Sequence, residues 1–352
     1  MPDAKSFPLI TDGPIAVRQE EMHRKPYLVG LDALRAVAAC SVCLFHFSGG
    51  MMPKLVVPAV KSALSQGYLG VDIFFVISGF IIPYSLLGKN HRITDFGAYM
   101  IRRLLRINPP AYVAIFLVLG QWFFIDSVIN HSSQYTLGLS WWQLLNNLLF
   151  TIPFTEYKWI NGVCWTLAIE LQFYIFIGLF FSIMFARSIW WFVFVYVLIS
   201  FVPSEKIGFI QYSSLFALGG TALLWQQRRI SATLFGAGLL LFGVLIFYRF
   251  GMYAALVGIT TSLAINTIKI KVAGLTLLGK ISYSMYLVHG LIGTTMEFVL
   301  IKLLSPTTDA RKLSLMAVCF LLAIVGSYGF YKLIEQPFLR LTMQNRNSKV
   351  PA

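Results

Sequence analysis

The sequence predicts an all-α, polytopic membrane protein in which about ten transmembrane helices form one bundle with a central polar cleft. Hydrophobic residues make up 57% of the 352 residues and charged residues only 12%, about half of the charged share of an ordinary soluble domain. The mean hydropathy is +0.73. Apolar stretches close to the roughly 20 residues that span a bilayer recur at 29–48, 67–87, 108–126, 163–185, 188–202, 209–225, 232–249, 252–267, 281–302 and 313–334.

The basic residues predict how these spans are oriented. With the N-terminus inside, the inner segments carry 19 Lys and Arg residues and the outer segments carry eight. The positive-inside rule therefore places both termini in the cytoplasm, with tails at 1–27 and 341–352 around a membrane domain at 28–340. The net charge of +14 follows from basic loops beside an anionic inner leaflet, so it does not indicate nucleic acid as a partner. The apolar stretch 137–151 is too short to span, and we expect it to be re-entrant or to lie on the surface.

The first span carries two ionisable residues. Arg35 and His46 are eleven residues apart, which at about 100° per residue returns to nearly the same helix face, about 16 Å further along the axis. A charged side chain inside a membrane helix costs about 2.5–3.5 kcal/mol and normally faces a protein interior or a water-filled cavity. We therefore expect the pair to line one polar track toward the bilayer centre. Cys40 and Cys43 are expected to pack in the helix, since no second cysteine pair completes a tetrahedral zinc site.

The second span contains Asp72 in an otherwise apolar run. A buried carboxylate needs a cationic or hydrogen-bonding partner, and Arg35 and His46 are the nearest candidates along the chain. An aspartate that orients a histidine selects its tautomer and raises its basicity. The alternative is that Asp72 caps the outer end of this helix.

The connection before the third span is rich in arginine, with Arg102, Arg103 and Arg106. Arg103 and Arg106 are three residues apart, so in a helix they project from one face. Because arginine binds phosphate oxygens in bidentate fashion, the cluster predicts a binding site for a nucleotide-like cofactor at the cytoplasmic mouth of the bundle. The alternative is that these charges only set topology and contact lipid headgroups.

Three later spans contribute further polar residues. Glu170 is the acidic residue of the fourth span, about two turns from its start; the alternative is a carboxylate exposed at the interface. The ninth span opens with hydroxyl groups, including that of Tyr283, and continues to His289, which either faces a ligand or is packed. Glu335, at the end of the last span, is interpreted as a structural partner for a cytoplasmic basic residue. Tyr174 is interpreted as an interface or packing aromatic.

The order of the motifs along the chain resembles that in a known family. They are R-x10-H in the first span, D-x-F-F-x-x-S-G-F in the second, R-x-x-R before the third, W-[ST]-L-x-x-E-x-x-F-Y in the fourth, S-Y-S-x-Y-L-x-H in the ninth and I-E-x-P-F at the last. The series resembles the acyltransferase 3 family of integral membrane O-acyltransferases over about residues 28–340. One difference is that the family often has two adjacent acidic residues, whereas here Glu170 stands alone.

The resemblance implies a ten-helix bacterial inner-membrane protein that moves an acyl group, usually acetyl, from cytoplasmic acyl-CoA to a hydroxyl group. The acceptor it implies is a sugar of a surface or exported glycan or of a glycolipid. By motif, His46 is the catalytic histidine, Arg35 is its motif partner, and Arg103 and Arg106 serve the CoA side. We expect no metal and no appended extracytoplasmic esterase-like domain. The remaining motif positions are matched by Asp72, Ser78 and Glu170.

Acyl transfer to a hydroxyl group needs a base for the proton and a positive site for the developing oxyanion. We predict His46 as the general base, supported by Asp72 or Glu170, with Arg35 near the thioester. A covalent acyl-histidine intermediate remains an alternative. We assign the CoA phosphates to Arg102, Arg103 and Arg106. We assign substrate binding to Ser78, Tyr283 and His289.

A transporter or flippase for a polar small molecule or a lipid-linked glycan is the main rival function. Intramembrane Arg, Asp, Glu and His residues also mark transport pathways. Transporters often contain repeated halves, and the sequence shows no convincing internal repeat. The sequence therefore favours the enzyme, and it leaves the acceptor, the acyl chain length and the oligomeric state open.

Overall fold

The computed structural model describes residues 29–49, 58–87, 91–131, 133–186, 188–268 and 271–347. The structure is 85% helical, and no strand occurs within these ranges. The predicted N-terminal tail 1–27 lies outside the described residues, as do the last five residues of the predicted C-terminal tail.

The helices follow the predicted spans closely in position. The longer helices are α2 (Val29–Gly49), α4 (Gly70–Leu86), α5 (Phe96–Phe124), α7 (Trp165–Phe181), α8 (Ile189–Ser200), α9 (Gly208–Gln226), α10 (Ala232–Phe250), α11 (Met252–Thr267), α12 (Ala273–His289), α13 (Thr295–Leu304), α14 (Asp309–Phe330) and α15 (Gln336–Asn347). Two short helices complete the set, α3 (Pro58–Ser65) and α6 (Trp141–Leu148).

Seven helical segments in the described part of the chain are long and apolar enough to cross a bilayer. The two shortest predicted spans correspond to α8 and α11, which are apolar but shorter than those seven segments. The predicted sixth span corresponds to α9, most of whose residues are buried among other helices. A polytopic helical membrane protein is thus confirmed, while the count of ten crossings stays a prediction. The seven segments are Gly30–Gly49, Val60–Leu86, Ile93–Ile129, Gly162–Phe185, Ala232–Phe250, Ala273–Leu304 and Asp309–Leu341.

Glycines allow the central helices to approach closely. A Cβ atom built on Gly79 of α4 would lie 2.0 Å from the carbonyl oxygen of Phe216 in α9, and one on Gly219 would lie 2.0 Å from that of Val76. Small residues at a membrane helix crossing let two backbones come together and gain dispersion contacts. Where α2 packs against α12, Gly279 has the same function, because its Cβ would lie 2.2 Å from a carbonyl oxygen of α2.

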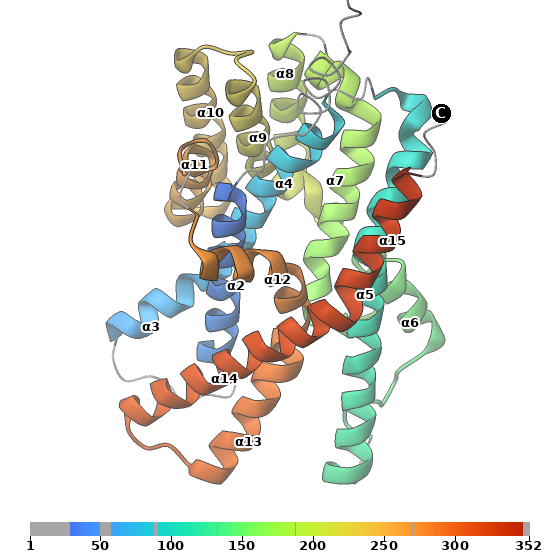
Figure 1. Cartoon of the computed structure of the whole chain (residues 1–352), viewed down its shortest axis with the longest axis vertical. Helices are drawn as coiled ribbons and strands as arrows, with labels where there is room; N and C mark the ends of the chain where they lie inside the picture. The colour runs from blue at the N-terminus through green and yellow to red at the C-terminus, as the bar shows by residue number, and fades with distance from the viewer. Residues whose placement is uncertain are drawn as a thin grey trace, which may run out of the picture.

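Two long helices contain a π-helical turn that redirects their side chains. The segment Gly290–Thr294 joins α12 to α13, and the segment Tyr331–Glu335 joins α14 to α15. Figure 1 shows α14 and α15 running diagonally across the bundle toward α5, which extends along most of one side. Such π turns widen a helix locally and are frequent at functional sites. The last predicted span is therefore longer than expected, since its helix continues to Asn347.

The start of α5 differs from the sequence prediction. The third span was expected at 108–126, but the helix begins at Phe96 and passes through Pro109 and Pro110 without ending. Neighbouring groups in membrane proteins satisfy backbone carbonyls that a proline leaves free, so such prolines are tolerated. The arginine cluster is consequently part of this helix and not of a loop, so its side chains take helical directions.

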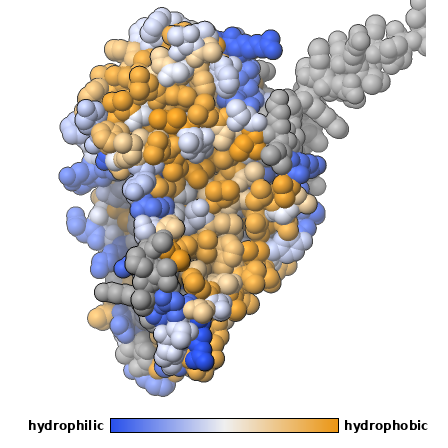
Figure 2. All heavy atoms as spheres, turned by 90° about the vertical axis from the view of Figure 1, so that its left-hand side faces the viewer, coloured by the Kyte–Doolittle hydropathy of each residue, from blue (hydrophilic) through white to orange (hydrophobic). Residues whose placement is uncertain are grey.

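The outer surface carries many apolar side chains. Figure 2 shows a broad hydrophobic area over the side of the molecule that it displays. Leu240 of α10 is 69% exposed and Val325 of α14 is also 69% exposed. A continuous apolar surface of this kind matches a lipid environment. The predicted surface segment 137–151 forms the short helix α6, whose Trp141 is 84% exposed.

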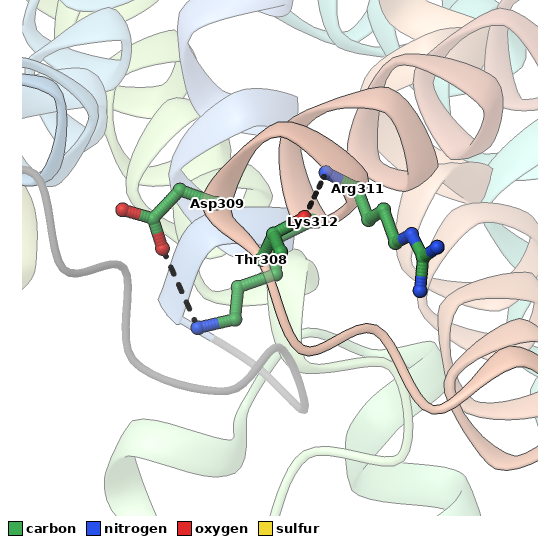
Figure 3. Close-up of polar contacts among 4 residues, drawn as sticks. All are labelled: Thr308, Asp309, Arg311 and Lys312. Carbon is green, nitrogen blue, oxygen red and sulfur yellow. Dashed lines mark hydrogen bonds and ion pairs between the residues drawn. The ribbon is translucent and has the colours of Figure 1, made fainter.

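The loop before α14 is held by a helix cap and an ion pair. The hydroxyl oxygen of Thr308 accepts a hydrogen bond from the backbone N–H of Arg311 at 3.4 Å, and Lys312 Nζ lies 3.5 Å from Asp309 Oδ1 (Figure 3). Threonine is a preferred N-cap residue, and a carboxylate in the first turn is favoured by the helix dipole. These contacts fix where α14 begins.

Candidate active site

A cavity of about 470 Å³ lies among α2, α4, α5, α7 and α12 and is closed on one side by the segment Tyr331–Glu335. One wall is apolar and consists mainly of α4 side chains, among them Phe74, Phe75 and Ile77. The opposite walls carry charged and hydroxyl groups. The predicted site residues that line the cavity are Arg35, Ser78, Arg103, Arg106, Glu170 and Tyr283.

Arg103 is held in place from three directions. Its Nη2 atom donates a hydrogen bond to Ser85 Oγ at 2.5 Å, and its guanidinium carbon lies 5.5 Å from the ring centroid of Tyr99 and 5.4 Å from that of Tyr174. Stacking of a guanidinium between aromatic rings is favourable and restricts its rotation. One NH2 group of the guanidinium is thereby hydrogen-bonded to Ser85, and these contacts hold the guanidinium at the cavity in a defined orientation.

The arginine cluster divides into two residues that line the cavity and one that does not. Arg106 lines the cavity one helical turn from Arg103, as their spacing predicted. Arg35 reaches the same space from α2 and interacts electrostatically with Arg106, with Asp32 and with Glu170. Arg102 is exposed and does not line the cavity, because it points to another side of α5. The geometry therefore brings three arginines together, with Lys280 as a fourth basic residue of the lining, and leaves Arg102 outside.

Glu170 is one of three carboxylates that line the cavity, together with Asp32 and Glu335. Its Oε1 atom accepts a hydrogen bond from the hydroxyl group of Tyr174 at 2.5 Å and another from Ser78 Oγ at 3.4 Å. The interpretation of Tyr174 as a packing or interface aromatic was therefore incomplete. The spacing of Glu170 and Tyr174 by four residues on a helix is the signal that predicts their contact. The carboxylate, the hydroxyl groups and Arg35 together form a polar cluster inside the membrane-spanning region.

Two residues of the cavity come from the last helices of the chain. The hydroxyl group of Tyr283 donates to the carbonyl oxygen of Ile107 at 2.6 Å, which ties α12 to α5. Glu335 accepts a hydrogen bond from Ser284 Oγ at 2.5 Å and interacts electrostatically with Arg106. Glu335 was interpreted only as a structural partner for a basic residue, yet it lines the cavity. The π turn that contains it places it there, and the sequence pattern does not reveal this turn.

Asp72 is not where the sequence led us to expect it. Its side chain is buried, does not line the cavity, and makes neither a hydrogen bond nor an ion pair with any residue that the structure describes. The expected pairing with Arg35 or His46 is therefore wrong. Asp72 lies in the first turn of α4, where the helix dipole favours a negative charge. This position agrees with the alternative that Asp72 serves the end of its helix, although it forms no capping hydrogen bond there.

His46 lies outside the cavity, three residues from the end of α2. Its side chain is exposed, and its ring centroid lies 5.1 Å from that of His289. Arg35 and His46 share a helix but do not line one continuous cavity, which corrects the expected polar track. Among the described residues, neither Asp72 nor Glu170 contacts His46, so the support expected from a carboxylate is not in place.

Tyr286 lies at the boundary between the cavity and the two histidines. It lines the cavity, and its ring centroid lies 6.1 Å from that of His289 and 5.9 Å from that of Phe74. Its hydroxyl oxygen accepts a hydrogen bond from Thr166 Oγ1 at 2.8 Å and lies 3.2 Å from the carbonyl oxygen of Val163. These contacts hold the ring between the space with the arginines and the side with His46.

In the part of the chain that the structure describes, no group of three or more His, Cys, Asp or Glu side chains is arranged to hold a metal ion. The ionisable groups of the cavity are three arginines, one lysine, one aspartate, two glutamates and several tyrosines. Such a set can bind an anionic ligand, orient a thioester and stabilise a developing negative charge.

Comparison with known proteins identifies the family. Residues 28–332 match the model of a family described as the acyltransferase domain, so the chain belongs to this family. Its relatives include a Bacillus subtilis protein named as a candidate peptidoglycan O-acetyltransferase, 33% identical over 158 residues, which are 42% of this chain and 23% of the relative. A Staphylococcus aureus protein named as a candidate O-acetyltransferase is 31% identical over 204 residues, 55% of this chain and 29% of that protein.

The O-acetyltransferase OatA of Staphylococcus aureus is 31% identical over 166 residues, 45% of this chain and 25% of OatA. The chain thus spans less than a third of the length of these relatives. No solved structure matches the chain.

Proposed function

We propose that this member of the acyltransferase domain family is a bacterial inner-membrane O-acetyltransferase. It transfers an acetyl group from acetyl-CoA, bound from the cytoplasmic side, to a hydroxyl group on a sugar of a surface or exported glycan. The observation that carries the proposal is the cavity, in which Arg35, Arg103 and Arg106 converge beside Glu170. The names of the relatives support acetyl as the transferred group and a glycan as the acceptor.

The donor is assigned to the cavity for reasons of charge and orientation. Arg103 and Arg106 lie near the start of α5, which the positive-inside rule places at the cytoplasmic face. Phosphate groups of CoA pair with guanidinium groups through charge-assisted hydrogen bonds. The apolar wall of α4 suits the less polar arm that carries the thioester. Arg35 lines the same cavity from α2, where a cation is suited to stabilise the carbonyl oxygen as charge develops.

The chemical step is a direct transfer of the acetyl group from the sulfur of CoA, the leaving group, to the oxygen of the acceptor hydroxyl group, the nucleophile. The acceptor oxygen attacks the thioester carbonyl carbon, so a carbon–oxygen bond forms and the carbon–sulfur bond breaks. His46 takes the proton of the acceptor hydroxyl group as general base, and this proton finally neutralises the thiolate of CoA. Because Tyr286 separates the cavity from the histidines, the transfer requires the acetyl group to reach the boundary that this ring forms.

The test uses the purified full chain in lipid nanodiscs with acetyl-CoA labelled in the acetyl group. Peptidoglycan fragments and a surface polysaccharide that lack O-acetyl groups serve as acceptors. We expect release of CoA that depends on an acceptor, and acetyl esters on the glycan by mass spectrometry. A chain that hydrolyses no acetyl-CoA with either acceptor, and whose deletion leaves glycan O-acetylation in cells unchanged, would contradict the proposal.

His46→Ala tests the base assignment separately from the reaction class. Loss of a general base lowers kcat by about 100- to 10,000-fold, while binding of acetyl-CoA should remain, since His46 is not a cavity residue. Full transfer activity in a His46→Ala protein that inserts normally would refute the base assignment and leave the acetyltransferase assignment intact. Trapping labelled acetyl on the protein without acceptor would indicate the covalent alternative.

A further inference from the structure

The two histidines near the ends of α2 and α12 lie side by side, and within the described ranges neither of them makes a hydrogen bond or an ion pair with a carboxylate. His289 is 1% exposed, and its Nδ1 atom lies 2.8 Å from the carbonyl oxygen of Tyr286 and 3.1 Å from that of Met285. Carbonyl oxygens only accept hydrogen bonds. The Nδ1 atom of a neutral His289 must therefore carry the proton, and its Nε2 atom must present a lone pair.

The hydrogen bond at Nδ1 fixes the ring of His289. The two carbonyl oxygens beside Nδ1 belong to Met285 and Tyr286 in the preceding helical turn, and the π segment Gly290–Thr294 begins directly after His289. Donation from the imidazole N–H to these carbonyl oxygens sets both the tautomer and the orientation of the ring.

The other nitrogen of His289 has no partner. Nε2 is buried and makes no hydrogen bond with any described residue. Buried polar atoms are normally hydrogen-bonded, because an unmade bond in a low-dielectric interior is costly. The nearest imidazole is that of His46, whose ring centroid lies 5.1 Å away at an interplanar angle of 41°. The two rings are not hydrogen-bonded in the structure, but at this separation a rotation of the exposed His46 side chain brings one of its N–H groups to the Nε2 lone pair.

The packing around the pair keeps the two rings together. A Cβ atom on Gly293 would lie 2.1 Å from the ring of Phe47, the residue after His46. The ring of Phe47 in turn lies 6.3 Å from that of His289. The π turn after His289 thus packs closely against the end of α2, and a larger residue at position 293 would force the two helices apart.

We propose that His289 is the positioning residue of His46: its Nε2 atom accepts a hydrogen bond from one nitrogen of His46 and leaves the other nitrogen unprotonated toward the acceptor hydroxyl group. This assignment rests on the proposed function. It gives His289 the role that Asp72 or Glu170 was expected to fill, since a hydrogen bond from one ring nitrogen decides which of the two is the base. His289 itself does not contact the reacting atoms.

The test compares two substitutions of His289, one that keeps the hydrogen-bond acceptor of the ring and one that keeps its donor. His289→Gln keeps an acceptor oxygen near the ε position, whereas His289→Asn keeps a donor near the δ position and loses the acceptor. His91→Asn is the matched control, because His91 is also buried and its Nε2 atom lies 3.0 Å from the carbonyl oxygen of Gly178, away from the cavity. All variants are measured as the full chain in nanodiscs with acetyl-CoA and a glycan acceptor.

We expect His289→Asn to lower kcat by about 100-fold, with KM for acetyl-CoA unchanged, and His289→Gln to retain most of the activity. The acid limb of the kcat/KM profile should move to lower pH in His289→Asn only, because loss of the acceptor disfavours the protonated form of His46. Of the other titratable groups, Tyr286 on α12 contacts the ring of His289, and Cys43 on α2 and Cys319 on α14 belong to the buried cluster that also contains Phe47. Equal activity of the Asn and Gln variants, with the wild-type pH profile, would overturn the proposal.

A measurement on the wild-type chain does not depend on the folding of any variant. The chain has five histidines, so their ring nitrogens can be resolved by NMR after labelling with 15N-histidine. We expect the Nδ1–H tautomer at His289 and a hydrogen-bond correlation between its Nε2 atom and the ring of His46. An Nε2–H tautomer at His289 would overturn the pairing. If His46→Ala keeps full activity, the base assignment fails instead, whatever the NMR spectrum shows.

Discussion

Replacing Arg103 tests whether the cavity holds the phosphates of the donor. The structure gives this guanidinium one hydrogen bond, to Ser85 at 2.5 Å, and two aromatic rings at 5.4 and 5.5 Å. A charge-assisted hydrogen bond contributes about 1.5–3 kcal/mol, so loss of one phosphate contact in Arg103→Ala should raise KM for acetyl-CoA by about 10- to 150-fold. The value of kcat should change little, since the phosphates are remote from the reacting bond.

For Arg103→Lys we expect a KM for acetyl-CoA between those of wild type and Arg103→Ala. Lysine keeps the charge but loses the planar fork and the stacking on the rings of Tyr99 and Tyr174, and each such cation–π contact contributes about 0.5–1 kcal/mol. KM should therefore rise by about 5- to 30-fold, as expected for about 1–2 kcal/mol. Higher salt should weaken the binding of acetyl-CoA to wild type more than to the Ala variant, since salt screens a charge contact.

The matched control is Arg102→Ala, which removes an arginine of the same cluster that does not line the cavity. Steady-state kinetics in nanodiscs, with detection of the released CoA thiol, measure both constants for each variant. A normal KM in Arg103→Ala together with a raised KM in Arg102→Ala would refute the placement of the donor. If Arg103→Ala and Ser85→Ala both lower the melting temperature, part of the change in KM of Arg103→Ala is due to loss of the hydrogen bond between these two residues.

Three further substitutions address the carboxylate, a helix crossing and the surface helix. Glu170→Gln should lower kcat/KM by about 10- to 100-fold, because it removes one of the two carboxylate charges that interact with Arg35 in the cavity; activity equal to wild type would contradict this role. Gly219→Ala should lower stability by about 1–3 kcal/mol through overpacking of α4 against α9, and a melting temperature in detergent equal to that of Gly236→Ala, where a Cβ meets nothing within 4 Å, would argue against it. Replacing Trp141 by Ala should reduce the quenching of tryptophan fluorescence by brominated lipid, because an exposed indole on α6 is expected at the membrane interface; unchanged quenching would place α6 away from lipid.

The sequence alone determined the class of fold and the segments that form the bundle. Hydropathy reports the local cost of exposing backbone and side chains to lipid, and that cost depends on each segment by itself. For this reason the predicted spans coincide with helices, and the two shortest were also those that the structure shows as short. Spacing within a helix is likewise local, so the common face of Arg103 and Arg106 was predictable.

The tertiary structure decided which polar side chains meet. Asp72 had no local feature to show that its expected partners lie elsewhere, and Glu335 reaches the cavity only because a π turn redirects its helix. The pairing of His46 with His289 joins residues 243 positions apart through the packing of α2 on α12. Such contacts depend on helix crossings set by glycines and on local departures from the α-helix, and neither can be read from the periodicity of a single segment.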